Sequence, residues 1–170
     1  MHPDGAPTLV LRPARPADTP RVIALITRVF AEYGLFCDVD GFDRDLHDPG
    51  GYCRARGGEF WVAEMRGQIV ATVGVTLDES TGELKRLYVD AAARGRGLGR
   101  RLTQHAIDFA RAAGCTRFIA WSDTLFTHAH ALYRGMGFVQ AGRRPLDDVN
   151  QSWEYGFWLP LGPGDGPAQR

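Results

Sequence analysis

Several features that are rare or missing in this sequence exclude whole classes of protein. No apolar run approaches the roughly 20 residues that a membrane-spanning helix needs, and no secretory signal pattern is visible, so we expect a cytoplasmic protein without membrane contacts. Cysteine is scarce, because Cys37, Cys53 and Cys115 are the only three and form no Cys-x-x-Cys pair. This pattern argues against a disulfide framework and a zinc site, so we expect free thiols and no metal.

Net charge is absent as well, since the formal net charge at pH 7 is +0. A general electrostatic attraction to nucleic acid is therefore not supported. The charges are nevertheless unevenly distributed. Residues 85–101 carry six basic side chains against one acidic side chain, whereas residues 38–48 carry five aspartates against one arginine. The basic segment suggests an anionic ligand, while the acidic segment fits either a cationic ligand or a solvated surface.

Internal repeats and candidate linkers are also missing, so we expect residues 1–170 to form one domain with a core from about residue 8 to 159 and loose termini. Hydrophobic spacing predicts strands at 8–12, 60–65, 68–77, 83–89, 117–121, 138–142 and 153–159. It predicts helices at 18–33, 98–113 and 127–136, and a short helix near 41–47 within the poorly patterned segment 34–58. The order β-α-(α)-β-β-β-α-β-α-β-β predicts an α/β fold with a mixed sheet. In this sheet, strands 83–89 and 117–121 are parallel neighbours.

The most informative segment is an arginine–glycine loop between a predicted strand and a predicted helix. It reads Arg94-Gly95-Arg96-Gly97-Leu98-Gly99-Arg100. Glycines let the backbone approach a ligand closely, and the first amides of a helix are unpaired and partially positive. The loop therefore predicts a phosphate or pyrophosphate site, although a plain structural turn is the alternative. The third glycine comes one residue early for a dinucleotide fingerprint, and the Gly-Lys-Ser/Thr of a Walker-type loop is missing.

The loop resembles the acyl-CoA loop of the GNAT superfamily of N-acetyltransferases, Arg/Gln-x-x-Gly-x-Gly/Ala. Two further motifs of that family match in the same order: Glu83, Leu87 and Val89, then Ala129, Leu132, Tyr133, Gly137 and Phe138. The resemblance implies the GNAT fold, in which the parallel strands 83–89 and 117–121 splay apart and hold acetyl-CoA as co-substrate. One departure is Phe126, which stands where the family commonly has an asparagine, so Thr127 or His128 would have to replace that contact.

The resemblance also implies roles for individual residues. The pyrophosphate would bind the loop amides, with charge-assisted contacts from its arginines, and the pantetheine arm would pair with the strand before the loop. The expected cofactor-binding residues are Leu87, Tyr88, Val89, Arg94, Gly95, Arg96, Gly97, Leu98, Gly99 and Arg100. Tyr133 matches the general acid that protonates the departing sulfur, although a core tyrosine is the alternative. Glu83 matches a general base or water relay, although an ordinary paired carboxylate is the alternative.

The acceptor is less well defined. The resemblance implies direct acetyl transfer to a primary amine, and neutral charge favours a small molecule. Acetylation of a protein N-terminus or lysine, a CoA-binding sensor without transferase activity, and an interaction domain that binds no CoA remain open. An acidic lining would suit a cationic amine, and Glu32, Tyr33, Asp38 and Asp40 fall in the region that covers the acceptor in this family. Trp121 could also line that site, and a homodimer is left open.

Overall fold

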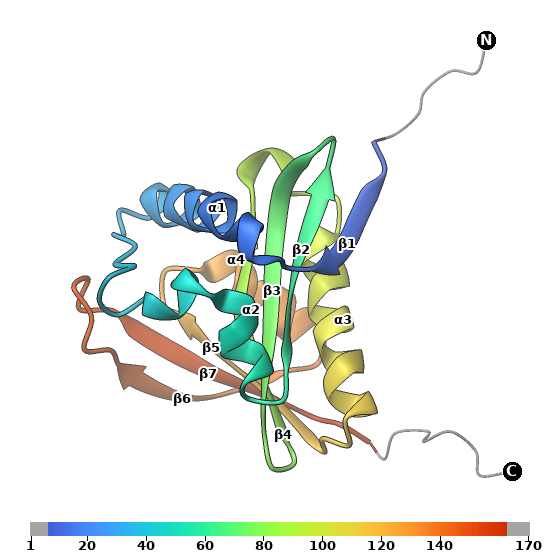
Figure 1. The fold of residues 1–170 in the computed structure, drawn as a ribbon. Helices are drawn as coiled ribbons and strands as arrows, with labels where there is room; N and C mark the ends of the chain where they lie inside the picture. The colour runs from blue at the N-terminus through green and yellow to red at the C-terminus, as the bar shows by residue number, and fades with distance from the viewer. Residues whose placement is uncertain (1–6, 163–170) are drawn as a thin grey trace, which may run out of the picture.

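The structure, a computed structural model, describes residues 7–162 (Figure 1). Its order of helices and strands is the predicted one. The elements are β1 (Leu9–Pro13), α1 (Thr19–Glu32), α2 (Pro49–Arg54), β2 (Glu59–Met65), β3 (Gln68–Asp78), β4 (Thr81–Val89), α3 (Leu98–Ala112), β5 (Arg117–Asp123), α4 (Thr127–Gly135), β6 (Val139–Pro145) and β7 (Trp153–Pro160). Single 3₁₀ turns are η1 (Pro16–Asp18), η2 (Arg44–His47) and η3 (Ala91–Ala93).

The strands form one mixed sheet in the order β1-β2-β3-β4-β5-β7-β6. Its neighbours pair antiparallel except β4 and β5, which are parallel as the α3 crossover predicts. Helices cover both faces, with α1 and α2 on one side and α3 on the other (Figure 1). The alternation of β2 reflects this, because Phe60 and Val62 pack in the core with α1, whereas Trp61 and Ala63 pack in the core with α3. Both faces of the sheet are therefore buried.

The parallel pair separates partway along its length. The β4–β5 ladder joins Thr81–Leu84 to Arg117–Ala120 and goes no further. Beyond it, β4 remains paired to β3 through a bulge at which Arg86 has a φ of 50° and its carbonyl accepts the Thr72 hydroxyl at 2.8 Å. The predicted splay of the two strands is thereby confirmed, and it leaves one edge of β4 free of a strand partner.

The glycine loop joins the open end of β4 to α3. Gly95 and Gly97 have φ values of 76° and 71°, which other L-residues adopt only with strain. Neither position has a heavy atom within 4 Å of where a Cβ would be, so the space in front of the loop is open. Gly97 directly precedes α3, so the first amides of that helix face the same opening.

The segment 34–58 is more ordered than predicted. The short helix expected near 41–47 is a 3₁₀ turn at 44–47, and a separate helix, α2, follows it. The Asp48 side chain caps α2 by accepting the Gly51 amide at 2.9 Å, and Pro49 occupies its first position. This Asp-Pro signal is visible in the sequence and was missed. Strand β6 also continues to Pro145, beyond the predicted 142.

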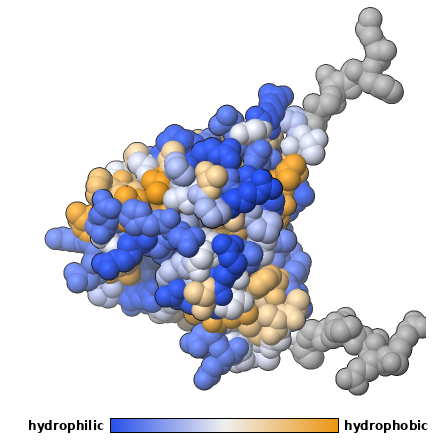
Figure 2. All heavy atoms as spheres, in the orientation of Figure 1, coloured by the Kyte–Doolittle hydropathy of each residue, from blue (hydrophilic) through white to orange (hydrophobic). Residues whose placement is uncertain are grey.

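The predicted loose ends, residues 1–7 and Pro160 onward, fall mostly outside the described residues. At the last described positions β7 reaches Pro160, and Leu161 is buried. Figure 2 shows a mostly hydrophilic face, on which hydrophobic residues gather at the left, over α1 and the loop that follows it. Two exposed aromatic residues, Phe36 and Phe42, belong to that loop. Within residues 7–162, no helix is both long and apolar enough to cross a membrane.

Candidate active site

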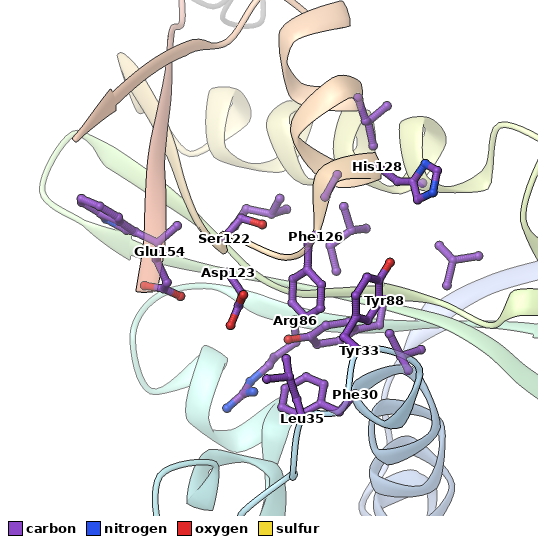
Figure 3. Close-up of a pocket in the computed structure, with 18 of the residues that line it drawn as sticks. Phe30, Tyr33, Leu35, Arg86, Tyr88, Ser122, Asp123, Phe126, His128 and Glu154 are labelled. Carbon is purple, nitrogen blue, oxygen red and sulfur yellow. The ribbon is translucent and has the colours of Figure 1, made fainter. Parts of the chain in front are cut away.

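A cavity with a volume of about 620 Å³ begins at the glycine loop. It runs along the free edge of β4 and past α4, and it ends between two loops, residues 33–43 and 146–152. Figure 3 shows side chains from β4, β5, β7 and the end of α1 around this space. A single cavity therefore joins the predicted phosphate site to a second compartment of different chemistry.

Most of the predicted cofactor-binding residues line this cavity. They are Leu87, Tyr88, Val89, Arg94, Gly95, Gly97, Leu98, Gly99 and Arg100. Arg96 is exposed and is not among the lining residues. The structure thus brings together a strand edge, open glycine backbone and a helix N-terminus, which is the arrangement that an anion attached to an extended arm requires.

The loop arginines differ in their surroundings. Arg94 forms a bidentate ion pair with Glu32 of α1, with N–O distances of 2.6 and 2.9 Å, and its Nε donates to the Val89 carbonyl at 3.0 Å. The Glu32 carboxylate raises the pKa of Arg94. Arg100 also lines the cavity but makes no ion pair with any residue in the described part of the chain. Arg94 therefore ties α1 to the loop, and Arg100 is the arginine available to a phosphate.

Tyr133 projects from α4 into the core beside the cavity that it lines, and only 4% of its surface is exposed. Its ring packs against Phe138 and Phe157, with centroid distances of 5.4 and 5.2 Å. No residue between 7 and 162 hydrogen-bonds to its hydroxyl, and burial raises the pKa of that hydroxyl well above its usual value. The group therefore keeps its proton at neutral pH, as a proton donor must.

Glu83, the predicted base, lies on β4 outside the set of cavity-lining residues. Its Oε1 accepts a hydrogen bond from Lys85 Nζ at 2.7 Å, so it forms an ion pair with that lysine. Burial raises the pKa of Glu154, which does line the cavity, and the charges of Lys85 and Glu83 lie close enough to act on it as well. Glu83 can thus reach the cavity only through an intermediate group or water.

Phe126, which replaces the expected asparagine, belongs to an aromatic wall. Its ring centroid lies 4.9 Å from that of Tyr33, 6.1 Å from that of Tyr88 and 6.3 Å from that of Phe30 (Figure 3). Burial raises the pKa of Tyr88 to about 12. Of the two neighbours proposed to replace the asparagine, His128 lines the cavity and Thr127 does not.

The prediction that the carboxylates of Glu32, Asp38 and Asp40 line the acceptor site is wrong. Glu32 is engaged by Arg94, Asp38 turns toward its own loop and accepts the Phe42 amide at 3.3 Å, and the Asp40 side chain is 90% exposed beside His47. None of these three carboxylates lines the cavity, whereas Tyr33 does. Short-range turn hydrogen bonds and solvation account for their positions.

Four other carboxylates line the far end of the cavity instead: Asp43, Asp123, Asp148 and Glu154. Arg86 also reaches it from the β4 bulge (Figure 3). Trp121 lines the cavity as predicted. Sequence reasoning missed Asp123 and Glu154, because they meet only through the register of β5 with β7, which pairs them directly. Within residues 7–162, no cluster of three or more His, Cys, Asp or Glu side chains could hold a metal ion.

Asn150 connects the two loops at this end. Its side-chain amide donates to the Phe36 carbonyl and accepts the Phe36 amide, both at 2.9 Å. Asn150 comes from the β6–β7 loop, and Phe36 from the loop after α1. The two hydrogen bonds therefore join segments that are 114 residues apart in the sequence and bring the two loops together beside the cavity.

Comparisons with known proteins agree with this geometry. The chain is 38% identical over 102 residues to N-acetyltransferase 8 of Rattus norvegicus, a match that covers 56% of this chain and 46% of that protein, so it spans less than half of that relative. It is 31% identical over 136 residues to the uncharacterized N-acetyltransferase YjgM of Escherichia coli (strain K12), covering 76% of this chain and 81% of YjgM.

Among solved structures, a GNAT superfamily phosphinothricin acetyltransferase from Sinorhizobium meliloti, in complex with acetyl-CoA, superimposes with a TM-score of 0.72 at 20% identity. The match covers 96% of this chain and 92% of that one. At that identity the likeness concerns the fold. The family model described as Acetyltransferase (GNAT) family matches residues 24–138, which include the splayed strands, the glycine loop and Tyr133. On these grounds the chain belongs to the GNAT acetyltransferase family, whose co-substrate is acetyl-CoA.

Proposed function

We propose that this protein is an N-acetyltransferase that moves the acetyl group of acetyl-CoA to a primary amine of a small molecule. The observation that carries the proposal is one continuous cavity. It joins the open glycine loop and the free edge of β4 to the buried hydroxyl-bearing Tyr133 and then to a separate polar compartment. Donor and acceptor could therefore meet in one enclosed space beside a proton donor.

The donor end fits acetyl-CoA in three respects. The α3 amides and Arg100 suit its pyrophosphate, the open glycines Gly95 and Gly97 leave room for close approach, and the unpaired β4 edge at Leu87 and Val89 suits the amides of the pantetheine arm. A backbone amide of that strand would then polarise the thioester carbonyl. Bound acetyl-CoA would occupy part of this cavity, so the acceptor would have less than its full volume of about 620 Å³.

Transfer proceeds in this proposal by direct attack. The amine nitrogen bonds to the carbonyl carbon, the carbon–sulfur bond breaks, and the sulfur takes the proton of Tyr133 while the nitrogen loses its own proton. A primary amine with a pKa near 10 is roughly 99.9% protonated at pH 7, so a proton acceptor for the free amine is useful. Glu83 is the residue to test for that role, acting through water because it does not line the cavity.

A small acceptor is favoured over a polypeptide by the far end of the cavity. The two loops there are joined by the Asn150–Phe36 hydrogen bonds, which narrow the room for a chain to pass through. We also propose that the protein works in the cytoplasm, because Cys37, Cys53 and Cys115 are all free and buried.

The proposal is tested by calorimetry with CoA and by thiol release from acetyl-CoA over a panel of amines. We expect CoA to bind, and at least one amine to accelerate thiol release in the wild type far more than in the Tyr133→Phe variant. CoA binding without turnover on any amine would favour a sensor module. No heat and no thermal shift at millimolar CoA would end the acyltransferase interpretation.

A further inference from the structure

The cavity has opposite charge at its two ends. Its donor end is formed by the basic loop, whereas its acceptor end contains more carboxylates than cations. Arg86, which lines the acceptor end, is already matched by two aspartates: Nη1 lies 2.8 Å from Asp43 Oδ1, and Nε lies 3.0 Å from Asp45 Oδ2. Arg86 is therefore not free to bind a carboxylate of the acceptor, and this group of three side chains keeps one negative charge.

Asp123 is the carboxylate that most needs an explanation. Only 8% of the residue is exposed, yet it makes no ion pair with any residue between 7 and 162. Its Oδ1 accepts the Leu125 amide at 2.8 Å, so the local turn satisfies one oxygen. Burial lowers the pKa of the neighbouring His130, so this imidazole is a poor counter-charge at neutral pH, and no ion pair within residues 7–162 balances the carboxylate. Burying a carboxylate without a cation is unfavourable, and such a group is retained most readily where a ligand supplies the opposite charge.

A second carboxylate lies directly opposite. Asp123 on β5 is the register partner of Glu154 on β7, so both side chains leave the sheet on the same face (Figure 3). Like charges placed opposite each other in a sheet are destabilising. Glu154 has a cation, since Arg144 Nε donates to its Oε2 at 2.8 Å. Arg144 thus pairs with Glu154, while the facing Asp123 has no ion-pair partner within residues 7–162.

Asp148 is another lining carboxylate without an ion pair in the described residues. It accepts the Ser152 amide at 2.7 Å and belongs to the β6–β7 loop, close in sequence to Asn150, which hydrogen-bonds to Phe36. Asp123, in contrast, ends the strand that borders the β4 gap, near the start of α4. Asp123 is therefore the more buried of the two lining carboxylates, and Asp148 lies in the loop at the end of the cavity.

We propose that the acceptor is a diamine or polyamine, whose reacting amine binds beside Asp123 and whose second, positively charged amine binds near Asp148. This inference rests on the proposed N-acetyltransferase function and names its substrate class. The aromatic side chains of Tyr33 and Phe126, which line the same cavity, suit the aliphatic chain and the cationic groups of such a molecule. A free α-amino acid would instead place its carboxylate among these carboxylates.

In the reaction, the ammonium form of the bound amine loses one proton to the surrounding water or to a relay before it attacks. As the nitrogen bonds to the thioester carbon, it becomes positively charged, and Asp123 stabilises that charge until the nitrogen gives up its second proton. The sulfur leaves with its bonding electron pair and is protonated by Tyr133, which is reprotonated in turn. The balance is one N-acetylated amine, one CoA thiol and one proton released to solvent.

The test compares three acceptors of one chain length: a diaminoalkane, the corresponding aminoalcohol and the corresponding ω-amino acid. Thiol release is measured with saturating acetyl-CoA. We expect kcat/KM for the diaminoalkane to exceed that for the aminoalcohol by about 10- to 100-fold, the worth of one charge-assisted hydrogen bond, and the amino acid to be poorer still. Equal or better use of the aminoalcohol or amino acid would overturn the inference while leaving the N-acetyltransferase proposal intact.

Two variants test the roles proposed for Asp123 and Asp148. Asp123→Asn keeps an oxygen that accepts the Leu125 amide, so we expect an unchanged melting temperature and CoA affinity but a loss of about 10- to 100-fold in kcat/KM for all amines. Asp148→Asn should reduce only the preference for the diaminoalkane. Asp108→Asn, on the exposed face of α3, removes the same charge outside the cavity and serves as the matched control.

Several outcomes would count against the inference. Equal effects of Asp123→Asn and Asp108→Asn would overturn it. If Asp123→Asn fails to fold, the wild-type acceptor ranking and Asp148→Asn still decide. CoA binding without thiol release on any of the three acceptors, or on a wider panel of amines, would instead refute the proposed function itself.

Discussion

The Tyr133→Phe variant separates a catalytic hydroxyl from a merely structural one. The ring of Tyr133 is 4% exposed and packs against Phe138 and Phe157, and phenylalanine preserves those contacts. The hydroxyl has no hydrogen-bond partner among residues 7–162, so its removal leaves no buried donor or acceptor unsatisfied in that region. The structure therefore predicts a large effect on catalysis and a small effect on folding.

The magnitudes follow from these surroundings. A buried tyrosine hydroxyl that hydrogen-bonds to the protein contributes about 0.5–1.5 kcal/mol, whereas here we expect a change in unfolding free energy near zero and a melting shift below about 2 °C. Loss of a general acid lowers kcat by roughly 100- to 10,000-fold, or about 2.7–5.5 kcal/mol of barrier. Because a thiol has a pKa of about 8.5, its thiolate leaves without much help, and we expect the lower end of that range.

The assay is steady-state thiol release with the best acceptor, together with CoA titration calorimetry and thermal denaturation of both proteins. We expect kcat to fall at least about 100-fold at neutral pH, with the CoA dissociation constant changed less than about twofold. The deficit should narrow above the thiol pKa, where protonation of the sulfur matters less. An unchanged kcat would refute the general-acid assignment, and a melting shift of several degrees with a parallel loss of CoA binding would show a structural role.

Other predictions concern binding, stability and thiol reactivity. Arg100→Ala should raise the CoA dissociation constant about 10-fold, and Arg96→Ala less than about twofold, because Arg100 lines the cavity and Arg96 does not; equal effects in calorimetry would contradict this. The ion pairs of the buried Asp18 hold the pKa of its carboxyl well below the usual range. Asp18→Asn should therefore cost about 3–5 kcal/mol at neutral pH. This difference should be complete above about pH 4 and be lost as pH falls toward the folded-state pKa, as denaturant titrations at several pH values would show. Burial raises the pKa of Cys53 to about 12, so its thiol should resist a thiol reagent at pH 8 in the native protein and react once urea unfolds it.

The donor end of the site could be predicted from the sequence because it is local. The β4 edge, the loop and the start of α3 are contiguous, and glycine spacing together with strand and helix patterns specifies their geometry without knowledge of the rest of the fold. Nine of the ten predicted cofactor-binding residues line the cavity for this reason. Arg96 does not line it, and Arg94 is engaged by Glu32, because the direction of a loop side chain depends on neighbours from α1 that no local pattern reveals. The roles of Glu83 and of these binding residues stay predictions.

The acceptor end could not be predicted in the same way, because segments far apart in the sequence form it. Which carboxylates line it depends on their burial in the folded protein and not on how many a segment contains. The sequence pointed to the aspartate-rich segment after α1, yet Asp40 is exposed, whereas Asp43 is only 5% exposed and holds Arg86. Asp123 is an isolated acid two residues after the predicted strand 117–121, and nothing local distinguishes it from a turn residue. The role proposed for Asp123 depends on the β5–β7 register, which places Glu154 opposite it. It also depends on the absence of an ion-pair partner for Asp123 among residues 7–162. The charge of the acceptor can therefore be argued only from the assembled sheet, and the matched acceptor series tests that argument directly.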